Sequence, residues 1–85
     1  MKVYLAHNGF LRLDSGATVK DYNHSTTTPI MVQAVGTQVW VYYGYDRIMK
    51  EEAANVFLAD GITPAGATAA LVQTYIENLI TVLES

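Results

Sequence analysis

The chain has 85 residues, no cysteine and a formal net charge of −3, so we expect one small domain over residues 1–85 without disulfides. Charged residues make up only 15%, against about 25% in ordinary domains, which indicates an unusually neutral or apolar surface. A domain of this size buries a limited core, and we therefore expect self-association to help stabilise it.

The charges are unevenly distributed along the chain. All 5 basic residues lie within residues 1–50, whereas residues 51–85 carry acidic residues and no base. Nucleic acids and anionic lipids are bound mainly through Lys and Arg, so we expect neither as a partner. No apolar run approaches the roughly 18 residues that span a bilayer, and the N-terminal segment is too soon interrupted for a signal peptide. We expect a soluble protein that is cytoplasmic when made.

A first hairpin is predicted around Asn8-Gly9, a pair that supplies the two positive-φ residues of a type I′ turn. Residues 2–7 and 10–14 would then pair. In this register the facing residues are Ala6 with Leu11 and Tyr4 with Leu13. A second turn is predicted at residues 14–16, followed by a short strand at 17–20 and a loop at 21–29.

A second hairpin is predicted around Gly36-Thr37, because glycine at the first loop position suits a type II′ turn. Residues 30–35 would pair with residues 38–43. Since side chains alternate along a strand, this register separates two faces. The apolar face has Ile30, Val32, Ala34, Val39, Val41 and Tyr43. The opposite face has Met31, Gln33, Val35, Gln38, Trp40 and Tyr42.

Two helices are predicted after this hairpin. The first covers residues 47–59, with Asp46 as its cap and apolar residues at helical spacing, although residues 56–58 also fit a short strand. The second begins with Thr63 as N-cap and Pro64 at the first helical position and runs to about residue 83. Its apolar seam contains Ala69, Val72, Ile76, Leu79 and Leu83. That seam could pack within the chain or on a second copy.

The predicted fold class is therefore α+β. Two hairpins form a small antiparallel sheet, and a middle helix and a long C-terminal helix follow, the latter packed on one face of the sheet.

The residue types of a hydrolytic triad are present but form no recognisable motif. They are His7, Asp14, Ser15, Asp21, His24 and Ser25. No nucleophile elbow or phosphate-binding loop occurs, and two histidines without cysteine are a poor zinc set. We therefore predict no catalytic residue, no cofactor and no metal ligand.

An aromatic cluster at residues 40–45 is the feature that most favours binding. Its residues could pack the core, form a protein interface, or stack on a sugar or a base. Only Arg47 is a nearby base, which disfavours nucleic acid. We predict an interface with another protein chain, in which the sheet face and the helix seam both take part. The predicted interface residues are Met31, Gln33, Trp40, Tyr42, Val72, Ile76, Leu79 and Leu83.

Residues 29–41, Pro-Ile-Met-Val-Gln-Ala-Val-Gly-Thr-Gln-Val-Trp-Val, are similar to β segments of small virion proteins of tailed bacteriophages. There an extended Pro-Ile-x-Val-Gln-x-x-Gly stretch leads into an aromatic and β-branched strand. The resemblance implies a structural protein associated with a capsid, neck or fibre, and hence a place in the virion. It transfers no functional residue.

The sequence thus predicts a non-enzymatic structural or assembly protein whose partner is itself, as a homo-oligomer, or another structural protein. The alternative is a small regulatory or ligand-binding module that uses the face of Met31, Trp40 and Tyr42. A small hydrolase or isomerase is the third class, and it would need His7 or His24 in catalysis.

Overall fold

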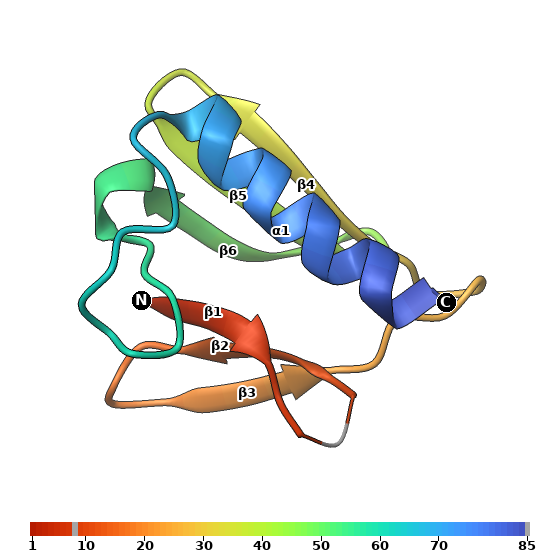
Figure 1. Ribbon diagram of the computed structural model, residues 1–85. Coiled ribbons are helices and arrows are strands. Elements are labelled where there is room, and N and C mark those ends of the chain that lie inside the picture. The colour runs from red at the N-terminus through yellow and green to blue at the C-terminus, as the bar shows by residue number, and fades with distance from the viewer. Residues whose placement is uncertain (8, 85) are drawn as a thin grey trace.

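The computed structural model describes residues 1–7 and 9–84 and has two three-stranded antiparallel sheets and one long helix (Figure 1). The first sheet contains β1 (Lys2–Leu5), β2 (Leu11–Asp14) and β3 (Val19–Tyr22) in that order. The second contains β4 (Ile30–Val35), β5 (Gln38–Tyr43) and β6 (Asp46–Glu52), also in chain order. A short 3-10 turn, η1 (Ala53–Asn55), and α1 (Ala69–Glu84) complete the chain. The α+β class is confirmed, although the two hairpins belong to two separate sheets and not to the single small sheet that was predicted.

The first hairpin forms, but its predicted register is wrong by one residue. Val3 faces Leu13 and Leu5 faces Leu11, and the backbone N–H of Ala6 bonds to the carbonyl of Phe10. The loop is therefore longer than the predicted two-residue turn, whose Asn8 lies outside the described residues. The physical reason is burial. The observed register puts the apolar residues of both strands opposite one another on one face, which outweighs the preference of the turn.

The strand after the second turn begins and ends two residues later than predicted, at Val19–Tyr22 instead of residues 17–20. Asp14 Oδ1 accepts a 2.8 Å hydrogen bond from the N–H of Gly16, which has a φ of +88°, so the predicted turn is confirmed. β3 then pairs with β2, and Arg12 faces Asp21 across the two strands. The loop between the sheets is correspondingly shorter and covers residues 23–29.

The second hairpin is confirmed in both turn and register. Val35 faces Gln38, and Gly36 has a φ of +62° at the first loop position, as a type II′ turn requires. The predicted apolar face is the inner one. Val39 and Val41 are fully buried there, whereas Met31 on the other face is 58% exposed.

The predicted middle helix is wrong, because residues 46–52 form β6 and only residues 53–55 make a single 3-10 turn. A tight turn at Gly44 and Tyr45 brings the chain back along β5, so that Tyr43 faces Asp46. Met49 and Ala53, which fit a helical spacing, are both buried, but a strand followed by a turn buries them. Pairing with the apolar central strand β5 outweighs the helical pattern.

The segment that follows η1 joins the two sheets. Phe57 lies beside β1, where its N–H bonds to the carbonyl of Met1 and its carbonyl accepts from the N–H of Val3. The strand alternative for residues 56–58 was therefore nearer to the structure than the helix. Tyr22 of β3 and Tyr43 of β5 add a ring contact between the sheets, with centroids 5.2 Å apart.

The C-terminal helix is confirmed, but it begins at Ala69 and not at Pro64. Thr68 is the N-cap, since its Oγ1 accepts a hydrogen bond from the N–H of Leu71 at 3.2 Å. Thr63, the predicted cap, bonds to Asp60 in a turn. Residues 64–68 form the entry to the helix.

The core lies between the inner face of the second sheet, α1 and the apolar face of the first sheet. Val72 and Ile76 of α1 are fully buried in it with Val3, Leu11, Val39 and Val41. The hydroxyl of Tyr75 donates a hydrogen bond to the carbonyl of Val3, which ties α1 to β1. One helix therefore covers most of the apolar surface that both hairpins present.

Candidate interaction surface

The outer face of the second sheet carries four of the eight predicted interface residues. Met31 faces Tyr42 and Gln33 faces Trp40 across β4 and β5, so the four side chains are neighbours. Met31 and Gln33 are exposed, and Trp40 and Tyr42 are half-buried. We call Met31, Gln33, Trp40 and Tyr42 the outer face.

Two basic residues of β6 border the outer face. The Arg47 guanidinium lies 4.8 Å from the centroid of the Trp40 ring, and the Lys50 ammonium lies 5.6 Å from it. Both distances are within the range of a cation–π contact. The indole N–H donates to Gln38 Oε1 at 3.1 Å, so the ring is held in place at its polar end as well.

Lys50 is the residue of this surface that the sequence did not reveal. A helix over residues 47–59 would have directed it away from Trp40, whereas the strand places it directly opposite in the β-ladder. The turn glycine, Gly44, two residues before Asp46, was the available signal for a third strand.

The other four predicted interface residues belong to α1 and lie on the opposite side of the second sheet. Val72 and Ile76 have no exposed surface, so within the single chain they are core residues. Leu79 and Leu83 are half-buried and pack against the same core. The structure therefore does not unite the two halves of the predicted interface, and its fully buried members are Val72 and Ile76.

The polar residues of hydrolytic type are spread over separate turns and strands. Asp21 accepts two hydrogen bonds from Arg12, at 2.8 and 2.9 Å, which lowers the pKa of its carboxyl. Ser15 and Ser25 each bond to threonines of their own turn. The Nδ1 atom of His24 accepts from the N–H of Ile30 at 3.0 Å. Asp21, Ser15 and Ser25 thus have partners in their own turn or strand pair. His24 instead contacts β4 and α1, since its Nε2 lies 3.6 Å from Glu84 Oε1, and His7 is exposed after β1.

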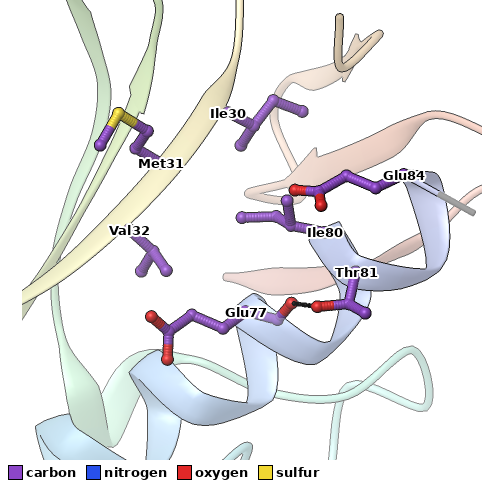
Figure 2. A pocket seen from close by; sticks show the side chains of 7 residues that line it. All are labelled: Ile30, Met31, Val32, Glu77, Ile80, Thr81 and Glu84. Atoms are coloured by element: carbon purple, nitrogen blue, oxygen red, sulfur yellow. Dashed lines mark hydrogen bonds between the residues drawn. The ribbon is translucent and has the colours of Figure 1, made fainter. Parts of the chain in front are cut away.

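A groove of about 270 Å³ runs between β4 and α1 (Figure 2). Its lining residues are Ile30, Met31, Val32, Glu77, Ile80, Thr81 and Glu84. Figure 2 shows the Glu77 and Glu84 side chains extending from α1 towards β4, on either side of Ile80. The groove therefore combines the open edge of a sheet with an apolar floor and two carboxylates.

The described residues contain no cluster of three or more His, Cys, Asp or Glu side chains that could hold a metal ion. Within the same part of the chain, no helix combines the length and apolarity needed to cross a membrane.

Comparison with known proteins adds no relative, since no protein-family model, curated protein or solved structure matches the chain.

Proposed function

We propose that this protein is a non-enzymatic structural or assembly component that associates, through its outer face, with further copies of itself or with another structural protein. The resemblance of residues 29–41 to small virion proteins of tailed bacteriophages extends this proposal to a capsid-, neck- or fibre-associated role. Those residues are Pro29, β4, the turn and residues 38–41 of β5, so they include Met31, Gln33 and Trp40 of the outer face.

The observation that supports the proposal is the contrast between the two sides of the second sheet. The inner side is covered by α1, and Val39 and Val41 are fully buried there. On the outer side Met31 is 58% exposed beside two aromatic residues, and a partner could bury this surface without any rearrangement of the core. Aromatic residues together with Met and Arg are the types enriched where proteins meet.

The test is the absolute mass in solution, measured by light scattering over a dilution series of about 100-fold. We expect a mass above that of one chain which falls on dilution. We expect Met31→Glu to lower the mass towards one chain, because it places a charge at an exposed apolar site of the outer face. A mass of one chain at every concentration would remove self-association and leave only a different structural protein as partner.

The matched control is Ile62→Glu, which makes the same change at a residue that is 79% exposed in the loop before α1. It should leave the mass unchanged. If both variants lower the mass equally, net charge and not the outer face would be responsible, and the proposal would fail.

A second candidate is a small regulatory or ligand-binding module that uses the same face. The observation in its favour is the pair of cations at Trp40, which would attract a small anionic ligand. In that case Trp40→Ala should abolish ligand binding and leave the mass of the chain unchanged. If the protein assembles through this face, the same substitution should instead lower its mass in solution towards that of one chain.

A further inference from the structure

β4 is one of the two edge strands of the second sheet, because β5 is its one partner among the described strands. In an antiparallel pair, alternate residues direct both their N–H and their C=O away from the partner strand. On β4 these residues are Ile30, Val32 and Ala34, because the N–H groups of Ile30 and Ala34 bond to side chains outside the ladder.

Those two N–H groups are already capped by side chains. His24 Nδ1 accepts from Ile30 at 3.0 Å, and Gln73 Oε1 of α1 accepts from Ala34 at 2.8 Å. Val32 lies between them in the same alternation, and among the described residues no side chain is bonded to its N–H or C=O. The edge is therefore closed at both ends and open in the middle, over the groove of Figure 2.

An extended chain is the ligand whose chemistry fits this opening. Its backbone can supply both the acceptor for the Val32 N–H and the donor for the Val32 C=O, as in strand addition to a sheet edge. From Ile30 to Ala34 the edge spans about 13 Å, at about 3.3 Å per residue, which accommodates a short segment.

The side chains on either side of the groove define which segment fits. Alternate residues of an added strand would point towards α1 and towards Met31, because side chains alternate along a strand. On the α1 side they would meet Glu77 and Glu84, which flank the nearly buried Ile80. The groove lining contains no Lys or Arg, and the one imidazole near it is that of His24, whose Nε2 lies 3.6 Å from Glu84 Oε1 among the described residues. On the other side they would meet the 58% exposed Met31.

We propose that the groove between β4 and α1 binds an extended segment of another protein in which basic and apolar residues alternate, by adding it as a strand to the edge at Val32. Lysine or arginine residues of the segment pair with Glu77 and Glu84, and apolar residues cover Met31. The site shares Met31 with the outer face, but the β4 edge at Val32 and the two glutamates lie outside that face. The tests below therefore use Glu77, Glu84 and the Val32 amide, and their failure can be told apart from failure of the outer-face assembly.

The probe is a fluorescein-labelled peptide of about seven alternating lysine and valine residues, followed by fluorescence anisotropy at low salt. We expect saturable binding that weakens as salt is added. The double variant Glu77→Gln/Glu84→Gln should weaken binding about 4- to 25-fold, since each exposed ion pair contributes about two- to fivefold. Asp46→Asn is the matched control, because it removes one charge at the other edge of the sheet and should leave affinity nearly unchanged.

The decisive readout is the amide of Val32 in hydrogen exchange measured by NMR. Saturating peptide should slow its exchange about tenfold or more, because the amide then lies in a β-ladder. A peptide of alternating glutamate and valine should not bind.

Three outcomes would overturn the proposal. One is no saturation up to about 1 mM peptide. Another is binding that the Glu77 and Glu84 variant leaves unchanged. The third is a Val32 amide that becomes protected with rising protein concentration alone, which would make a second copy of the chain the occupant. None of these results depends on the outer-face variants, whose own readout is the mass in solution.

Discussion

At the level of single residues, Gly66 is a position where close packing, and not the backbone angle, requires glycine. It has no positive φ, but a Cβ built on it would lie 2.8 Å from Leu71 Cβ and 2.8 Å from the backbone nitrogen of Val72. Such atoms belong to the first turn of α1 and cannot rotate away. Glycine is therefore required here because the entry segment crosses the helix start at very short range.

We predict that Gly66→Ala lowers the free energy of unfolding by about 1–3 kcal/mol, the usual cost of overpacking. The measurement is the urea midpoint. Adding Leu71→Ala should not restore stability, because the crowded atoms are the Cβ and the backbone, which alanine retains. A Gly66→Ala protein as stable as the wild type would show that the entry segment can move aside.

Three aspartates make the stability of the fold sensitive to acid. Arg12 lowers the pKa of Asp21 by hydrogen bonding, a backbone N–H lowers that of Asp14, and the Thr63 hydroxyl lowers that of Asp60. In the unfolded chain these groups titrate near pH 4, and in the folded chain at lower pH. The unfolded state therefore takes up protons first as the pH falls.

We predict that the contribution of these three aspartates to stability is constant from neutral pH to about pH 5 and is lost below about pH 4 as the pH approaches their folded-state pKa values. Asp21→Asn and Asp60→Asn should each reduce the difference in unfolding midpoint between pH 7 and pH 3. Asp46→Asn serves as the control, since the Asp46 carboxylate makes no hydrogen bond or ion pair with any other described residue, and it should show the wild-type difference. Equal differences in all variants would contradict this assignment.

At the level of secondary-structure elements, the start of α1 is a place where tertiary hydrogen bonds override a local helix-start signal. Thr63-Pro64 is a good local start for a helix, yet the helix begins at Ala69 behind Thr68. Ala65 instead bonds through its N–H to the carbonyl of Val56, which keeps the entry segment beside the segment that follows η1. The backbone partners of residues 64–65 thus lie outside the helix.

We predict that Thr68→Ala destabilises the helix start by about 1 kcal/mol, the usual cost of removing an N-cap. In hydrogen exchange, the Leu71 amide should lose protection in this variant. Thr63→Ala is the comparison, because it should leave the Leu71 amide as protected as in the wild type while disturbing the turn at Asp60. Loss of protection in both variants would mean that the whole entry segment unfolds together with the helix end.

How much could be predicted from the sequence varies between elements for physical reasons. The hairpin at Gly36 was predictable in full, since the turn glycine and the apolar alternation agree. The hairpin at Asn8-Gly9 was not, because the turn and the burial of Val3 and Leu13 favour different registers. For β6 the available signal was Gly44, because residues 46–52 do not alternate between apolar and polar as β4 and β5 do. Of the candidate surface, the sheet half was therefore predictable and Lys50 was not.

Considered as a whole molecule, the chain uses a single core for stability and leaves the outer face outside it. Ile76 lies at the centre of this arrangement, where α1 meets the second sheet, and is fully buried. Small domains have total stabilities of only about 5–15 kcal/mol, and this chain has no disulfide to supplement its core. Loss of one central side chain should consequently affect the entire fold.

We predict that Ile76→Ala costs about 2–5 kcal/mol and that Ile76→Glu, which also buries a charge, unfolds the chain at every concentration. Met31→Glu makes a comparable apolar-to-acidic change on the outer face and should keep native circular dichroism while the mass falls. The two effects are separated by recording circular dichroism and light scattering on the same samples. If Ile76→Glu gave a folded single chain of reduced mass, α1 would be an interface element and not part of the core, and the helix half of the predicted interface would replace the outer face as the assembly surface.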